Sequence, residues 1–157
     1  YNYPTIKFLT GSEEVVKKLV ENGVNKKNIF ILKSNKWFDI GIAKVKLEPL
    51  VHDTPNYALK LEYNNKKCIY IVDTASVENI KAKDYALYLI ESNYKKDILE
   101  YHKQICDNPD KMYYLDRVDQ THLSYEAANT FLIENMGVNS VYEYIHQSDY
   151  NFKGDEE

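Results

Sequence analysis

The chain has 157 residues, of which 44% are hydrophobic, and it carries a formal net charge of −4. This length is enough to bury the core of one domain, and the lack of a long apolar stretch excludes a membrane span. The acidic balance argues against a broad nucleic-acid-binding surface, which needs clustered lysines and arginines.

The first third of the chain predicts a strand, a helix and a second strand. The opening residues YNYPTIKFL predict a strand and show no secretory signal, so we expect a cytoplasmic protein. Ser12 is a plausible N-cap for a helix that Gly23 ends. The apolar face of this helix carries Val15, Val16, Leu19 and Val20. NIFIL is the next predicted strand.

The middle of the chain predicts a run of strands. IAKVKLEPL is one of them, and a second covers residues 57–63, where Tyr57, Leu59, Leu61 and Tyr63 alternate with Ala58, Lys60 and Glu62. This alternation is typical of a strand with one solvated face. Asn64-Asn65 predicts a tight hairpin turn, since asparagine tolerates positive φ. The returning strand CIYIV is apolar on both faces, which predicts a central position with cover on both sides.

The last third predicts two further strands separated by helices. YALYLI is a strand, and the helix after it carries an apolar stripe that includes His102, which we expect to be a packing or interface residue. Asn108-Pro109-Asp110 ends that helix. Ser124 starts another helix, which Gly137 ends. VYEYI is the last strand, and KGDEE is a frayed tail.

Four of the apolar runs stop on a side chain that can bind a metal ion. KVKLEPLV is followed by His52, CIYIV by Asp73, YALYLI by Glu91 and VYEYI by His146. Ligands of open α/β sheets bind beyond the carboxyl ends of strands, so these residues can converge. Two imidazoles and a carboxylate there predict a divalent-metal site. Residues 121–124, THLS, precede a helix and could act beside that metal.

These motifs, in this order, resemble a known superfamily. VHDTPNYALKLEYNNKKCIYIVDT, YALYLIESNY, THLSYEAANTFL and YIHQS resemble the second half of a metallo-β-lactamase-fold hydrolase, above all its small phosphodiesterase-like and its phage or Firmicutes members. The resemblance covers roughly residues 44–148. It implies an α/β fold, namely part of an αββα sandwich with a mixed sheet and covering helices. Residues 1–152 would form the C-terminal part of one such domain, and residues 153–157 a flexible tail.

The resemblance also implies a role for each site residue. His52 would bind one metal ion, His146 would bind a second, and Asp73 would bridge both. His122 would hydrogen-bond the substrate oxyanion or protonate the leaving group, and Glu91 would orient the site. Two divalent ions, zinc or manganese, would then hydrolyse phosphodiester or related ester bonds through a metal-bound hydroxide. The expected substrate is a small phosphoester or nucleotide-like molecule.

One feature of the superfamily is missing, because its H-x-H-x-D-H motif would precede His52 and no histidine does so here. Each ion would keep only two ligands, so we expect this chain alone to bind metal weakly or not at all and to be inactive. Truncation, a degenerate site or complementation by another chain would each explain the gap. A half-domain also leaves apolar surface open, which predicts self-association.

Other readings remain open from the sequence alone. The chain could be a non-catalytic interaction module that kept the fold, or an unrelated small α/β binding domain. His52 by itself could be a surface residue, and His122 could merely assist Ser124 in capping its helix. Asp53 is expected to be a turn residue that bonds its own backbone.

Overall fold

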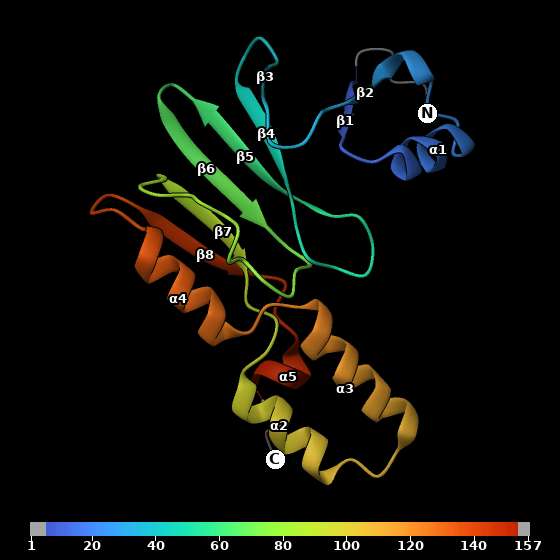
Figure 1. Cartoon of the computed structure of the whole chain (residues 1–157), viewed down its shortest axis with the longest axis vertical. Helices are drawn as coiled ribbons and strands as arrows, with labels where there is room; N and C mark the ends of the chain where they lie inside the picture. The colour runs from blue at the N-terminus through green and yellow to red at the C-terminus, as the bar shows by residue number, and fades with distance from the viewer. Residues whose placement is uncertain (1–5, 154–157) are drawn as a thin grey trace.

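The computed structural model describes residues 6–153, without the side chains of residues 152 and 153. Its larger sheet has six strands, and their order across the sheet follows their order in the chain. The strands are β3 (Trp37–Asp39), β4 (Lys44–Pro49), β5 (Tyr57–Tyr63), β6 (Lys66–Ile71), β7 (Leu87–Glu91) and β8 (Val141–Ile145). Strands β3 to β6 pair antiparallel, whereas β6, β7 and β8 pair parallel. This mixed sheet with its covering helices confirms the predicted α/β class (Figure 1).

Strand direction brings four chain segments to one edge of this sheet. Strands β4 and β6 are both antiparallel to β5, so they run the same way, and β7 and β8 are parallel to β6. The carboxyl ends of β4, β6, β7 and β8 therefore meet at the same edge, as the sequence predicted. The tight turn between β5 and β6 sets the register in which these two strands pair. Its residues Asn64 and Asn65 have φ of 48° and 59°, as the predicted turn requires.

One face of the sheet is covered by helix α4 (Tyr125–Asn135), which lies along β7 and β8 in Figure 1. Ser124 caps this helix by accepting a hydrogen bond from the Ala127 N–H at 3.2 Å. The core between helix and sheet includes Ile69, Ile71, Tyr88, Ile90, Leu123 and Phe131. Burial of these side chains is the main stabilising term of the fold.

In β5, the face that carries Lys60 is buried, although the alternation of polar and apolar residues assigns that face to solvent. Lys60 is only 2% exposed on the covered face, whereas Tyr63 on the opposite face is 55% exposed. Lys60 tolerates burial because its Nζ lies 2.6 Å from Glu48 and donates to the Lys81 carbonyl at 2.7 Å. A charged side chain with such partners can therefore occupy a core position that alternation assigns to solvent.

Strand β6 is central, as expected, but the prediction that both of its faces are buried is wrong. Ile69 and Ile71 are buried on the α4 side, whereas Tyr70 on the other side is exposed. The same open face carries the exposed side chains of Leu59, Tyr63 and Val141. Exposed apolar patches of this kind often mark sites of protein–protein contact. Self-association of the chain through this face stays a prediction.

Three helices gather beyond the carboxyl edge of the sheet: α2 (Lys96–Ile105), α3 (Pro109–Thr121) and α5 (Asp149–Lys153) (Figure 1). The sequence did not predict α3, because Asn108-Pro109 was interpreted only as the end of α2. Asn108 in fact accepts from the N–H groups of Asp110 and Lys111 and so caps α3, with proline at its start. His102 of α2 is buried and stacks on Tyr150 at 4.0 Å, which agrees with a packing role.

The N-terminal segment forms a small unit of its own, with β1 (Phe8–Thr10) parallel to β2 (Ile29–Ile31). Between them lie α1 (Glu13–Glu21) and the 3₁₀ turn η1 (Lys26–Asn28). The unit contacts the open face of the large sheet, where Leu32 packs with Val45 and Leu47. Residues 1–5 of the predicted first strand, and residues 154–157 of the predicted tail, lie outside the described residues.

No helix between residues 6 and 153 is both long enough and apolar enough to cross a bilayer.

Candidate metal centre

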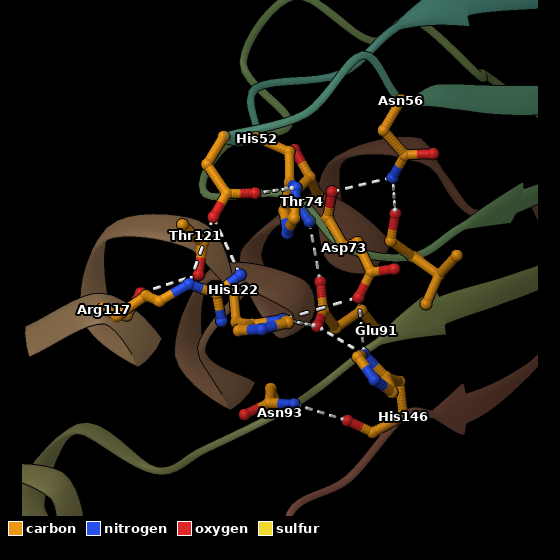
Figure 2. Close-up of polar contacts among 12 residues, drawn as sticks. His52, Asn56, Asp73, Thr74, Glu91, Asn93, Arg117, Thr121, His122 and His146 are labelled. Carbon is orange, nitrogen blue, oxygen red and sulfur yellow. Dashed lines mark hydrogen bonds and ion pairs between the residues drawn. The ribbon is translucent and has the colours of Figure 1, made fainter. Parts of the chain in front are cut away.

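Five side chains converge at the carboxyl edge of the sheet (Figure 2). They arrive from separate elements: Asp73 follows β6, Glu91 ends β7 and His146 follows β8. His52 lies in the loop after β4, and His122 is the C-cap of α3. Parallel strand direction thus brings together residues that are far apart in the chain.

Two of these residues have a left-handed backbone. Asp73 has φ of 54° and His146 has φ of 56°, which is uncommon outside glycine and is maintained only when neighbours hold it. The Asn56 side-chain amide donates to the carbonyls of Val72 and Asp73 at 2.6 and 2.9 Å. The Asn93 amide donates to the His146 carbonyl at 2.9 Å. An asparagine thus holds the backbone of each residue.

Glu91 is the buried anchor of the site, with an exposed fraction of 0%. Its Oε2 accepts the Thr74 N–H at 2.9 Å. Its Oε1 lies 2.6 Å from Nδ1 of His122 and 2.8 Å from Nδ1 of His146. A carboxylate removed from water needs such partners. In return, the Glu91 carboxylate fixes the orientation of both imidazole rings.

The ligand atoms of Asp73, Glu91, His122 and His146 all lie within 4.8 Å of one another. Asp73 Oδ1 is 3.2 Å from Nδ1 of His146 and 3.7 Å from Nδ1 of His122. Imidazole nitrogens and carboxylate oxygens are ligands that zinc and manganese accept. The chemistry of the donor set therefore fits a divalent ion.

His52 lies beside this group without belonging to it. Its ring centroid is 5.7 Å from that of His122, in an edge-on arrangement. Its Nδ1 lies 2.8 Å from Asp53 Oδ1, and its Nε2 is buried without a hydrogen-bond partner. An unpaired buried nitrogen is costly, and a metal ion would satisfy it. This orphaned atom is a second indication that the residues fit a metal.

Asp53 is not the turn residue that the sequence suggested. Its Oδ2 accepts from Nε and Nη2 of Arg117 at 3.1 and 2.8 Å, while its Oδ1 faces His52. The hydrogen bond from Arg117 is the main cause that lowers the pKa of Asp53 below its ordinary value. The carboxylate accepts these hydrogen bonds because α3, which was not predicted, brings Arg117 to it.

All five residues that the sequence singled out lie in this region, and their individual roles stay predictions. The sequence reasoning missed the residues that support them, namely Asn56, Thr74, Asn93 and Arg117. Asn56 and Thr74 lie within the motifs that surround His52 and Asp73, so position alone could have indicated them. No local signal links Arg117 to Asp53, since 64 positions separate them.

Comparison with known proteins identifies the fold. No family model matches the sequence, and no curated protein matches it. The metallo-β-lactamase-fold protein YhfI from Bacillus subtilis is similar in structure, with a TM-score of 0.60 and 14% identity. The match covers 85% of this chain and 48% of YhfI. This chain has a metallo-β-lactamase fold.

Two further similar structures are those of a Zn²⁺-bound protein and of a diphosphatase. Zn²⁺-bound PqqB from Methylobacterium extorquens matches with a TM-score of 0.63 and 13% identity, over 92% of this chain and 56% of PqqB. A diphosphatase of the PhnP family matches with a TM-score of 0.55 and 12% identity, over 88% of this chain and 46% of the diphosphatase. The chain thus spans about half the length of the metallo-β-lactamase-fold structures it matches.

Proposed function

We propose that this chain belongs to a metal-dependent hydrolase that cleaves phosphodiester or related ester bonds. The observation that carries the proposal is the group of four ligand atoms within 4.8 Å of one another, at the carboxyl edge of a metallo-β-lactamase-fold sheet. The descriptions of two structural relatives, one Zn²⁺-bound and one a diphosphatase, support the choice of metal and of bond. The substrate would be a small phosphoester or nucleotide-like molecule.

His52, Asp73 and His146 would hold the ions, two zinc or manganese ions in the complete site. When bound, such ions would lower the pKa of a water molecule and neutralise charge on a phosphoryl group. The side chains of Asp73 and His146 are partly exposed, so a substrate can approach them. Asp73 suits a position between two cations because its carboxylate offers two anionic oxygens.

Glu91 and His122 would handle the proton. Nδ1 of His122 faces Glu91 at 2.6 Å and lies farther from Asp73, at 3.7 Å. Nε2, on the opposite side of the ring, is then left to donate a proton to the leaving-group oxygen.

Two substitutions test this division of roles in the full-length protein. Asp73→Asn should lose both metal binding and hydrolysis, because an amide cannot serve as an anionic ligand of two cations. His122→Ala should keep the metal content and lower turnover by roughly 10²–10⁴-fold, as expected for loss of a general acid. Metal analysis and a rate assay on an aryl phosphodiester, with zinc or manganese supplied, measure both effects.

Asp39→Asn is the matched control, since Asp39 is exposed and bonds only the nearby Gly41 N–H among the contacts described. It should change neither measurement. Loss of metal in the His122 variant would show that His122 is a ligand. Metal binding without any hydrolysis in the unchanged protein would favour the non-catalytic interaction module.

A further inference from the structure

Three of the five site residues are connected through one buried threonine, Thr74, whose exposed fraction is 0%. Thr74 follows Asp73 directly in the chain. Its N–H donates to Oε2 of Glu91 at 2.9 Å, a bond that Figure 2 shows. Its hydroxyl accepts the N–H of Val51 at 3.2 Å, and Val51 directly precedes His52. One residue thus joins the loops that follow β4 and β6 to the end of β7.

The Thr74 hydroxyl uses its whole hydrogen-bonding capacity. Two N–H groups, those of Val51 and Ser76, donate to it at 3.2 and 3.4 Å, so they occupy its two lone pairs. Its proton goes to the Ser76 carbonyl at 2.8 Å, since a carbonyl can only accept. Because every bond of the hydroxyl has a partner, its orientation is fixed. It is therefore a fixed acceptor for the Val51 N–H.

Val51 is held on both sides, because its carbonyl accepts the Ala75 N–H at 2.8 Å. The Val51 N–H belongs to the peptide unit before this residue, and the Val51 carbonyl belongs to the peptide unit that joins it to His52. The two bonds therefore fix both planar units around Val51, and with them the direction in which the chain enters His52. The Val51 side chain is 53% exposed, so these backbone bonds, and not side-chain packing, hold the residue.

The other contacts of the loop that carries His52 lie on its far side. Asn56 donates to the carbonyls of Val72 and Asp73, but it lies where the loop enters β5. The side chains of Asp53 and Arg117 pair across exposed surface, where water and salt screen the attraction. The bond to the Thr74 hydroxyl is thus the buried attachment on the near side of His52.

We propose that Thr74 is a positioning residue, whose hydroxyl holds His52 beside His122 and so determines the affinity for the ion that His52 and Asp73 would share. This inference rests on the proposed function. Because Thr74 has no exposed surface, it acts through its neighbours and not on the substrate. His146, on the other side of the site, is held separately through Asn93, so the effect of Thr74 should be confined to the His52 side.

The first measurement reads the position of His52 in the metal-free chain. The ring centroids of His52 and His122 are 5.7 Å apart, and those of His122 and His146 are 5.2 Å apart. Both ring pairs should therefore show nuclear Overhauser effects between their carbon-bound protons. Thr74→Val keeps the shape of the side chain and leaves the Val51 N–H without its acceptor. The His52–His122 effect should then be lost, whereas the His122–His146 effect should remain.

Thr74→Ser is the rescue variant, because it keeps the hydroxyl and should keep both effects. Thr130→Val is the matched control, since the Thr130 hydroxyl donates to the Glu126 carbonyl at 3.0 Å on the exposed side of α4. It should change neither ring pair. Circular dichroism shows whether each variant is folded. If Thr74→Val does not fold, Thr74→Ala takes its place with the same expectation.

The second measurement uses zinc as the probe in the full-length protein, in competition with a chromophoric chelator. Zinc should bind in two steps, and His52→Ala identifies the step that needs His52. Thr74→Val should weaken that step by about 10–100-fold, which is typical for loss of a residue that orients a metal ligand. The other step should stay unchanged. Thr74→Ser should restore the affinity, and Thr130→Val should leave both steps as they are.

The outcomes separate this inference from the proposed function. An unchanged His52–His122 effect in folded Thr74→Val would overturn the positioning role even if the protein hydrolyses phosphodiesters. Loss of both ring contacts, or an equal weakening of both zinc steps, would also overturn it, because the damage would then be general. The same loss in Thr74→Ser would show that the hydroxyl is not the cause. The expected pattern would uphold the role even if the protein bound zinc without hydrolysing any phosphodiester.

Discussion

At the scale of single residues, the proposed site depends on strained backbone that amide side chains hold. Asn93→Ala would remove the donor to the His146 carbonyl, so the left-handed backbone there would lose its stabilising bond. We expect a loss of about 1 kcal/mol in the free energy of unfolding, the usual contribution of one hydrogen bond. Zinc affinity should fall as well, since His146 would no longer be held. Denaturant unfolding and chelator competition measure the two effects.

Asn93→Asp sharpens this prediction, because it keeps the shape of the side chain and replaces the donor with an acceptor that faces the carbonyl. Its effects should exceed those of Asn93→Ala. Asn22→Asp is the matched control, since the Asn22 amide donates to the Lys18 carbonyl at 2.8 Å on an exposed helix end. If Asn93→Asp proved as mild as the control, the hydrogen bond would not be what maintains the conformation.

Four of the five site residues could be predicted from the sequence, because each of them follows a run of apolar residues, and His122 could be predicted from its place just before a helix. Their supporting residues could not. Asn93 and Arg117 act through the carbonyl of His146 and the carboxylate of Asp53, and contacts across such distances in the chain leave no periodic signal. Pattern reasoning thus finds side chains that share a sheet edge and misses those that determine their orientation.

At the scale of elements, the N-terminal unit is held against the sheet by a close glycine contact. A Cβ atom added to Gly11 would lie 2.7 Å from Cζ of Tyr57, whose hydroxyl donates to the Gly11 carbonyl at 2.8 Å. Gly11→Ala should therefore cost about 1–3 kcal/mol in the free energy of unfolding, as overpacking usually does. Denaturant unfolding measures the loss.

A double-mutant cycle separates this clash from other effects of alanine. In a Tyr57→Ala background the ring is absent, so Gly11→Ala should cost little. Tyr57→Phe serves as the control that removes only the hydroxyl bond. An equal cost of Gly11→Ala in both backgrounds would show that Tyr57 does not hold the unit in place.

Elements were predicted well where alternation or capping was strong, as in the β5–β6 hairpin and α4. Helix α3 was missed because Asn108-Pro109 ends one helix and begins the next, and only the first meaning was used. Asparagine as N-cap and proline in the first turn are start signals as much as stop signals. The omission had a consequence for the site, because α3 carries Arg117 and delivers His122.

At the scale of the whole molecule, the sequence predicted strands β4 to β8 along the chain but not which face of the sheet they bury. Apolar residues line both faces of the central strands, so periodicity cannot say whether this chain covers one face or two. The structure covers the face that contains Lys60 and leaves Tyr63 and Tyr70 open. The buried charge is possible because Glu48, on the neighbouring strand, lies 2.6 Å from the Lys60 Nζ and the Lys81 carbonyl accepts a hydrogen bond from it.

The Lys60–Glu48 pair predicts how the stability of the molecule depends on pH. Burial alone would raise the pKa of Glu48, but hydrogen bonds from Lys46 and Lys60 outweigh it and lower the pKa below its ordinary value of 4.5. The folded state thus binds fewer protons than the unfolded state in this range. The stabilisation is complete above pH 4.5 and is lost as the pH falls through the lowered pKa of the folded state. Urea unfolding across this range should show the decline.

Glu48→Gln should remove this part of the acid dependence and destabilise the chain at neutral pH, because Lys60 would keep a buried charge without an anionic partner. We expect a cost of about 3 kcal/mol, near the lower end for breaking a buried pair, since the Lys81 carbonyl still accepts from Lys60. Combining Glu48→Leu with Lys60→Met should recover most of the loss, because neither charge is then buried. Glu14→Gln, in an exposed pair with Lys18, should change little. An undiminished acid decline in Glu48→Gln would assign it to other carboxylates.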